Sequence, residues 1–261
     1  MCEDSAPTNL HSSHKNYTSS AFSLYLGPIF TDGPPELSDE QGLSVCSNSH
    51  KYEITYKIDD EDPKIINGYH IGDLLGQGTY GRIHAAYDMK NSRQVAAKIL
   101  SQRRLKKIRS GEDNVRREIF IMKLLKHRNV VELIDVFEVK STDTLYLVLE
   151  LVGGGSLQTR LERAGGKLSS SEAKWYFRQL IEGLEYIHEQ GVVHRDIKPS
   201  NLMLTGEGLL KISDFGVAEL LDPQLSGIAY DRIPASYQSV SPAFASPEIA
   251  LGSQSVSGFK V

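Results

Sequence analysis

The chain has 261 residues, of which 40% are hydrophobic and 24% charged, a composition typical of a globular protein with one large or two small domains. This composition excludes a collagen, a mucin-like stalk and a wholly disordered chain, and the lack of any run of about 18 apolar residues excludes a multi-span membrane protein. The net charge of −4 comes from residues 1–50, which carry six acidic residues and one basic residue. The remainder is almost neutral, so we expect no nucleic acid as a partner.

Residues 1–60 are predicted to form a disordered, serine-rich tail, because serines cluster there and no periodicity is sustained. The tail begins with Cys2, Glu3 and Asp4 instead of the basic residues of a secretory signal. Cys2 and Cys46 are the only cysteines, which excludes a disulfide framework. We therefore expect a protein of the cytoplasm.

Five strands and one helix are predicted in the next part of the chain. The strands are 69–76, 82–88, 94–100, 131–139 and 144–149, and the helix is 112–126, where apolar residues recur at helical spacing. The basic run 103–109 lies between a strand and this helix. It can be a nuclear-import signal, which would add the nucleus as a second location, but we favour a solvated connection. Three glycines, 153–155, then interrupt the pattern, so a small, sheet-rich lobe is expected to end there.

The clearest helix is predicted at 170–190. Ser169 and Glu172 have the spacing of a capping box, and Gly191 is a stop signal. One apolar stripe along this helix comprises Ala173, Tyr176, Leu180, Leu184 and Ile187. Short β-like segments follow at 202–204 and 209–212, and a long loop reaches Pro247.

A glycine-rich pattern, G-x-G-x-x-G, occupies residues 76–81. Dinucleotide-binding folds place this pattern before a helix, whereas here a strand follows. Glycines allow backbone N–H groups to approach phosphate oxygens, although a plain hairpin turn explains the motif alone equally well.

Lys98 ends a mostly apolar run within the predicted strand 94–100, and its ammonium group needs a partner there. Glu118, twenty residues later on the predicted helix, can supply one. The pair would hold the lysine against the phosphates of a nucleotide. A structural ion pair is the alternative, but it leaves the upstream glycines unexplained.

The decisive stretch is His194 to Asn201, followed by Asp214-Phe215-Gly216. Phosphoryl transfer requires an oriented hydroxyl and neutralised charge. Asp196 can accept the proton of the attacking hydroxyl, and Lys198 can steady the transferred phosphoryl group. Asn201 and Asp214 offer the oxygen ligands that Mg²⁺ prefers. Residues 246–248 close the loop that follows Asp214.

In this order and spacing, these motifs resemble those of the eukaryotic protein kinases over residues 66–261. The resemblance implies an α+β, bilobal fold. Residues 66–150 would form an N-lobe with a five-stranded antiparallel sheet and the αC helix, 150–155 a hinge, and 156–261 a mainly helical, incomplete C-lobe. Lys198 resembles the Ser/Thr class. The implied catalytic residues are Asp196, Lys198, Lys98 and Glu118.

The resemblance also implies ATP and Mg²⁺ (or Mn²⁺) as cofactors. Asn201 and Asp214 would hold the metal, Leu149 would be the gatekeeper, and Ser241-Pro242 would receive the substrate residue. The implied nucleotide-binding residues are Leu75, Gly76, Gln77, Gly78, Thr79, Tyr80, Gly81, Arg82, Ile83, Ala96, Lys98, Glu150, Val152 and Met203.

A narrower resemblance, to the liver-kinase-B type of kinase, lies in residues 72–76, 98–100, 103–108, 114–119, 216–219, 241–244 and 257–261. The calcium/calmodulin-dependent kinase kinases are the nearest alternative. The liver-kinase-B type activates AMP-activated protein kinase, so the implied substrates are kinases with a threonine in the activation loop. The implied activating partners are a pseudokinase and an armadillo-like scaffold, without loop phosphorylation.

The resemblance stops at Val261, before the end of a complete kinase domain, so we expect a C-terminally truncated form: a fragment, a short isoform or an incomplete gene model. Two functions therefore compete. One is a Ser/Thr protein kinase in energy and polarity signalling. The other is a non-catalytic chain that binds nucleotide or partner proteins, and the 261 residues alone are expected to bind ATP weakly without measurable turnover.

Overall fold

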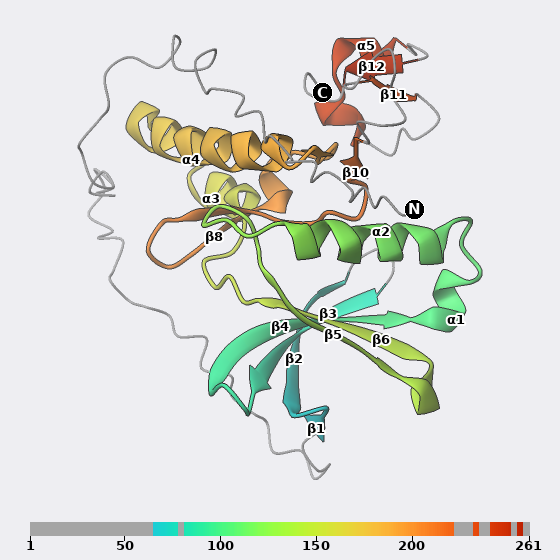
Figure 1. Ribbon diagram of the computed structural model, residues 1–261. Coiled ribbons are helices and arrows are strands. Elements are labelled where there is room, and N and C mark those ends of the chain that lie inside the picture. The colour runs from blue at the N-terminus through green and yellow to red at the C-terminus, as the bar shows by residue number, and fades with distance from the viewer. Residues whose placement is uncertain (1–64, 78–80, 222–231, 235–240, 252–254, 258–261) are drawn as a thin grey trace, which may run out of the picture. The chain divides into compact units, whose positions relative to one another are not determined.

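The computed structural model describes residues 65–77, 81–221, 232–234, 241–251 and 255–257 (Figure 1). The predicted tail, 1–60, lies outside the described residues. No helix within the described ranges is long and apolar enough to cross a membrane.

An antiparallel sheet forms the first part of the described chain, in the order β1-β2-β3-β4-β6-β5. Its strands are β1 (Ile65–Ile66), β2 (Tyr69–Gln77), β3 (Gly81–Asp88), β4 (Arg93–Ser101), β5 (Leu133–Val139) and β6 (Thr144–Glu150). The five predicted strands are confirmed to within two residues at each end. The sixth strand, β1, was not predicted, because two residues are too few to show a periodicity.

The two faces of this sheet differ, because side chains alternate along each strand. One face carries a buried cluster of Tyr69, Ala86, Val95, Ala97 and Val148. On the other face, Leu100 and Leu147 pack with Leu105 of α1 (Gln102–Leu105) and Val115 of α2 (Gly111–Leu124). Figure 1 shows α2 lying along this side of the sheet. The helix ends two residues earlier than predicted, because Leu125 has extended backbone.

The second part of the chain combines helices with short strand pairs. Its elements are α3 (Leu157–Arg163), α4 (Ser170–Glu189), β7 (Val192–Val193), η3 (Pro199–Asn201), β8 (Leu202–Leu204), β9 (Leu210–Ile212), β10 (Glu219–Leu220), β11 (Arg232–Pro234), η5 (Pro242–Phe244), α5 (Pro247–Ala250) and β12 (Ser255–Ser257). The strands pair as β8 with β9, β7 with β10 and β11 with β12. A short turn, η2 (Lys140–Thr142), joins β5 to β6.

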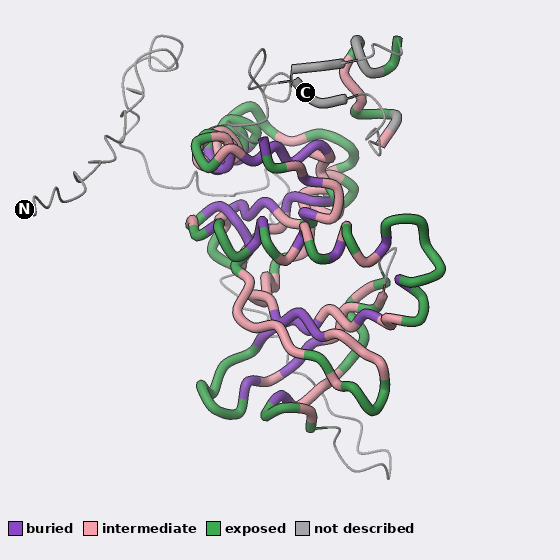
Figure 2. Tube along the Cα trace, turned by 45° about the vertical axis from the view of Figure 1, so that its right-hand side comes forward, coloured by how far each residue is buried: buried purple, intermediate pink, exposed green. Residues whose placement is uncertain are grey.

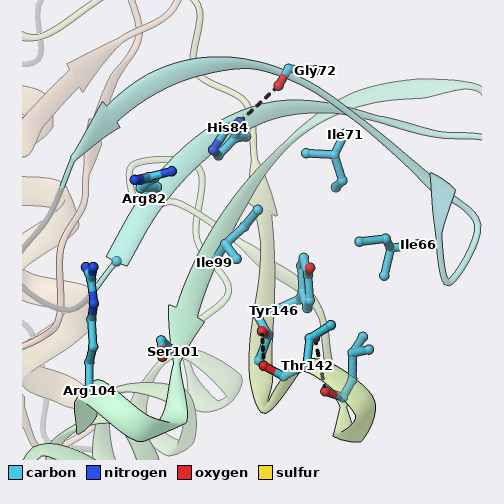
Figure 3. A pocket seen from close by; sticks show the side chains of 13 residues that line it. Ile66, Ile71, Gly72, Arg82, His84, Ile99, Ser101, Arg104, Thr142 and Tyr146 are labelled. Atoms are coloured by element: carbon cyan, nitrogen blue, oxygen red, sulfur yellow. Dashed lines mark hydrogen bonds between the residues drawn. The ribbon is translucent and has the colours of Figure 1, made fainter. Parts of the chain in front are cut away.

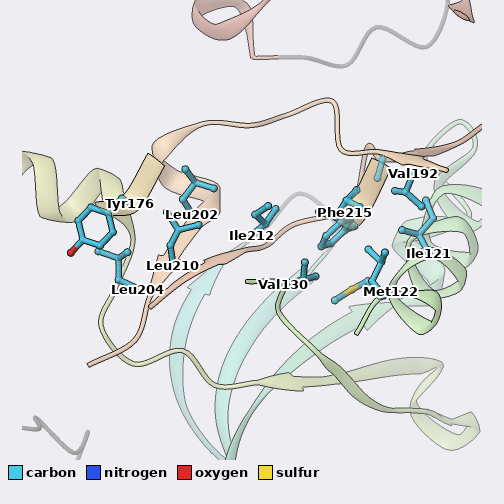
Figure 4. Close-up of a cluster of buried hydrophobic side chains, with 13 residues drawn as sticks. Ile121, Met122, Val130, Tyr176, Val192, Leu202, Leu204, Leu210, Ile212 and Phe215 are labelled. Carbon is cyan, nitrogen blue, oxygen red and sulfur yellow. The ribbon is translucent and has the colours of Figure 1, made fainter. Parts of the chain in front are cut away.

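The largest apolar cluster joins α2, α4 and the β8–β9 pair (Figure 4). Buried positions run through both this cluster and the sheet (purple in Figure 2). Phe215, Ile187 and Ile212 are among its completely buried side chains. Because Phe215 follows Asp214 directly, this core fixes the backbone beside a predicted metal ligand.

Four residues of the predicted apolar stripe of α4 are confirmed, because Tyr176 and Ile187 are buried and Leu180 and Leu184 pack against the largest apolar cluster, whereas Ala173 is exposed. The fully buried side of the helix also includes two polar positions. It comprises Glu172, Tyr176, Gln179, Gly183 and Ile187. Ser169 caps the helix as predicted, but the Glu172 carboxylate binds Arg160 instead of closing the capping box. Gln179 Oε1 accepts hydrogen bonds from the Leu210 N–H (2.9 Å) and from the side chain of Asn129. The polar positions are therefore tolerated because each has a partner.

Candidate active site

One face of the sheet brings together three of the predicted nucleotide-binding residues and the predicted gatekeeper. Ile83 pairs with Lys98, and Ala96 pairs with Leu149, so these four side chains share a face. This is also the face on which α2 lies. Gly78, Thr79 and Tyr80 lie outside the described residues.

The remaining residues of the glycine-rich pattern lie on β2 and β3. Gly76 pairs with Ile83, and Gln77 pairs with Arg82. Leu75 is exposed. Arg82 pairs with Ile99, so its side chain points to the face opposite Lys98.

Lys98 and Glu118 form the predicted ion pair. Lys98 Nζ lies 2.5 Å from Glu118 Oε1, and the two side chains are only 11% and 3% exposed. The second oxygen, Glu118 Oε2, is buried without a hydrogen bond and lies 3.9 Å from where a Cβ on Gly216 would stand. The pair therefore fastens α2 to β4 close to the Asp214-Phe215-Gly216 segment.

The Asp196 carboxylate is surrounded by donors. Oδ2 contacts Lys198 Nζ at 2.7 Å and accepts a hydrogen bond from Asn201 Nδ2 at 3.0 Å. Oδ1 accepts from the Ser241 hydroxyl at 2.8 Å and from its N–H at 3.4 Å. Burial alone would raise the pKa of Asp196, but the bonds from Lys198, Ser241 and Asn201 outweigh it and hold the pKa below its usual value. The carboxylate is thus an anion that can orient a hydroxyl.

Ser241 is a site residue whose role the sequence reasoning missed. Its hydroxyl donates to Asp196 and accepts from Lys198 Nζ at 2.7 Å, although 43 residues separate it from Lys198. The sequence indicated only that this loop receives a substrate residue. The Ser241 hydroxyl thus contacts both Asp196, the predicted base, and Lys198, the predicted phosphate-binding lysine, and these two side chains also contact each other.

We expect Ser241→Ala to lower kcat of the full-length protein by about tenfold or more, because hydrogen bonds to charged groups contribute roughly 1.5–3 kcal/mol. Ser241→Thr should keep most of the activity, since it keeps the hydroxyl. The measurement is steady-state phosphorylation with kcat and KM separated. Ser200→Ala, an exposed serine of the same region, is the matched control. Equal losses in Ser241→Ala and Ser241→Thr would contradict a role for the hydroxyl.

The two predicted metal ligands lie on segments tied to each other. The Ser213 N–H and hydroxyl both donate to the Asn201 carbonyl at 2.9 Å, which holds Asp214 beside this loop. Asn201 makes its side-chain bonds through Nδ2, to the Asp196 carbonyl and carboxylate, which leaves Oδ1 for a ligand. Within the described ranges, no three His, Cys, Asp or Glu side chains gather as a metal site. One amide oxygen and one exposed carboxylate, completed by phosphate oxygens, fit Mg²⁺.

His194 connects the catalytic loop to the Asp214 segment. Its Nε2 lies 2.9 Å from the Ser213 carbonyl, its Nδ1 can accept from the Asp196 N–H at 3.3 Å, and its ring packs edge-on against Phe215. Burial lowers the pKa of His194 despite the Ser213 bond, so the ring is neutral at physiological pH. Both Asp214 and Arg195 have positive φ values, 66° and 69°, which side-chain-bearing residues seldom adopt.

Two arginines share one carboxylate next to the catalytic loop. Glu219 Oε2 lies 3.5 Å from Arg195 Nη1 and 3.7 Å from Arg117 Nη1. The Arg195 side chain is only 6% exposed. Burial lowers the pKa of Arg195, and Glu219 works against this shift. Glu219 thereby links Arg195, which precedes Asp196 in the chain, to Arg117, which precedes Glu118.

The predicted hinge begins where β6 ends. The Glu150 side chain is occupied by Lys211, whose Nζ lies 2.9 Å from Oε1, so a nucleotide would meet the backbone of this segment. Met203 forms an isolated bridge with Ser156 just beyond the hinge. Val152 lies between Glu150 and Ser156 in the chain and is partly buried.

Comparison with known proteins gives a consistent picture. Residues 69–261 match the model of the protein kinase domain family. The chain is 45% identical to Serine/threonine-protein kinase STK11 of Rattus norvegicus over 210 residues, covering 80% of this chain and 47% of that protein. It is 44% identical to human STK11 over 234 residues, covering 89% and 52%, and 43% identical to the stk11 homolog of Dictyostelium discoideum over 209 residues, covering 80% and 35%. The chain thus spans about half the length of the two mammalian relatives.

Proposed function

The chain belongs to the protein kinase domain family and is of the STK11 (LKB1) type, and on this premise we propose that it transfers the γ-phosphate of ATP to serine or threonine side chains of proteins. The observation that carries the proposal is the Asp196 carboxylate, which is held by Lys198, Asn201 and Ser241 beside Asp214. This arrangement orients a hydroxyl and places the positive charge of Lys198 beside the transferred group, and phosphoryl transfer needs both.

In this reaction the substrate hydroxyl oxygen forms a bond to the γ-phosphorus, while the bond from that phosphorus to the bridging oxygen of ADP breaks. Asp196 orients the hydroxyl and accepts its proton. Lys198 neutralises charge on the transferred phosphoryl group, and Lys98, held by Glu118, binds the other phosphates. The product is a phosphoserine or phosphothreonine and ADP.

Asn201 and Asp214 would hold Mg²⁺ or Mn²⁺. The metal, when bound, supplies positive charge to the phosphate oxygens. The role of this chain's residues is to present one neutral and one anionic oxygen from segments that the Ser213 bonds keep together.

The finer assignment rests on the similarity to STK11. We propose kinases with an activation-loop threonine, including AMP-activated-type kinases, as substrates, in energy and polarity signalling. A pseudokinase and an armadillo-like scaffold are proposed as activating partners. The proposed location is the cytoplasm, with the nucleus as a second site.

The test is phosphorylation of a degenerate peptide library by the full-length protein with labelled ATP and Mg²⁺. We expect phosphoserine and phosphothreonine but no phosphotyrosine, and loss of labelling when the metal is chelated. ATP binding without transfer, in the presence of the proposed partners, would favour the second candidate, a non-catalytic chain that binds nucleotide.

A further inference from the structure

The sheet carries a pocket on the face opposite Lys98. The pocket has a volume of about 600 Å³, and the apolar side chains that line it are Ile66, Ile71, Ile99, Val139 and Tyr146 (Figure 3). Because Ile99 alternates with Lys98 along β4, this pocket is separated from the nucleotide face by the thickness of the sheet.

Two arginines border the apolar floor of the pocket. Arg82 comes from β3 and Arg104 from α1, and Figure 3 shows both on one side, away from Ile66. Both are exposed, and neither forms a salt bridge within the described residues. His84, between them and Ile71, is bonded to the Gly72 carbonyl at 3.0 Å. An occupant of this pocket must therefore combine apolar side chains with negative charge.

The chain segment directly before β1 has this combination. Its residues 52, 54, 56 and 58 are Tyr, Ile, Tyr and Ile, and they alternate with Glu53, Thr55 and Lys57. Four acidic residues, Asp59 to Asp62, follow. Seven alternating residues are the pattern of one strand with an apolar face. The predicted tail, residues 1–60, lacks sustained periodicity as a whole, and the prediction of disorder did not consider the short alternating stretch 52–58 near its end.

The segment is long enough to reach Arg82 from its attachment point at Ile66. Ile66 lines the pocket and pairs with Tyr69, which in turn pairs with Asp88 of β3. Arg82 lies six residues from Asp88 along the same strand, which is about 20 Å. Asp60 precedes Ile66 by six residues, and an extended chain covers about 20 Å in six steps. The carboxylates of Asp59 and Asp60 can therefore meet Arg82 at the far rim.

We propose that residues 52–62 of this chain occupy this pocket, with the carboxylates of Asp59 and Asp60 paired with the two arginines, Arg82 and Arg104, and the apolar side chains of residues 52–58 folded back over its floor. Covalent attachment at Ile66 raises the effective concentration of the segment at the pocket, so a modest intrinsic affinity is enough for occupancy. Charge complementarity selects this segment over an apolar peptide. The proposal is independent of the kinase activity.

Hydrogen–deuterium exchange of the full-length protein tests the proposal. We expect backbone amides of residues 52–58 to exchange about tenfold or more slowly than those of residues 36–46, because docked segments exchange through opening. Arg82→Glu with Arg104→Glu should remove this protection. Lys106→Glu with Lys107→Glu, in the same connection but outside the pocket lining, should leave it unchanged.

Two further variants keep the test decisive if the arginine substitutions disturb folding. Replacing the aspartates and the glutamate of residues 59–62 by asparagine and glutamine changes only the segment. This variant should also remove the protection of residues 52–58 from exchange. Asp59→Lys with Asp60→Lys should restore it in the Arg82→Glu, Arg104→Glu background. Equal exchange of residues 52–58 and 36–46 in the unmodified protein, or protection that survives all charge changes, would overturn the proposal. Protection that appears only as protein concentration rises would overturn it in favour of a second copy.

Discussion

Replacing Asp196 by asparagine should reduce phosphoryl transfer by about 10²–10⁴-fold and leave ATP binding nearly unchanged, because a positioned general base contributes a factor of that size. The substitution removes the anion to which Lys198, Asn201 and Ser241 donate. The nucleotide contacts proposed for Lys98, Asp214 and the glycine-rich loop remain. The measurements are single-turnover phosphorylation and calorimetric titration with ATP on the full-length protein.

Asp113→Asn is the matched control for this experiment. Asp113 is an exposed carboxylate in the first turn of α2. We expect its substitution to leave the rate within twofold, an effect typical of surface positions. A rate above half of the unmodified rate in Asp196→Asn would show that this carboxylate is not the base.

Lys98→Met and Glu118→Ala should each lower kcat/KM strongly, and the double variant should lose little more than the worse single variant. The two side chains share one buried contact, so either substitution removes the same ion pair. A double-mutant cycle measures this overlap as a coupling free energy, which for contacting residues is about 0.5–3 kcal/mol. Thermal unfolding of the same four proteins separates lost folding from lost catalysis.

The control cycle for this pair is Arg178 with Glu182, an exposed pair on α4. Its coupling should be small, about 0.3–0.5 kcal/mol, and should not appear in kcat/KM. If the losses in Lys98→Met and Glu118→Ala add fully, the two residues do not act as one unit.

The sheet and α4 could be predicted because their signals are local. The five strands are short segments rich in apolar residues, and α4 has Ser169 as its cap and Gly191 beyond its end. The candidate catalytic residues could be named from the sequence because kinase motifs keep fixed spacings, and their catalytic roles stay predictions. The contact between Lys98 and Glu118 confirms one such pairing.

Contacts between distant segments were not predictable, because periodicity carries no information about them. Ser241 reaches Lys198 across 43 residues, and Gln179 fills a buried position of α4 only because it contacts β9. Glu172 has a capping-box spacing, yet its carboxylate binds Arg160 on α3. In each case a tertiary hydrogen bond or ion pair decides where a polar side chain points.

The shared carboxylate of Glu219 has a consequence for cooperativity. If α2 moves away from the sheet, the ion pair between Arg117 and Glu219 and the ion pair between Glu118 and Lys98 break in the same displacement. The ion pair between Arg195 and Glu219 remains. Any ligand that favours the inward position of α2 therefore also changes the electrostatic environment of the residue beside Asp196. By linkage, a substrate that stabilises the catalytic loop must favour the inward α2 by the same free energy. The binding of nucleotide and the binding of substrate would then be coupled through a single atom, Glu219 Oε2.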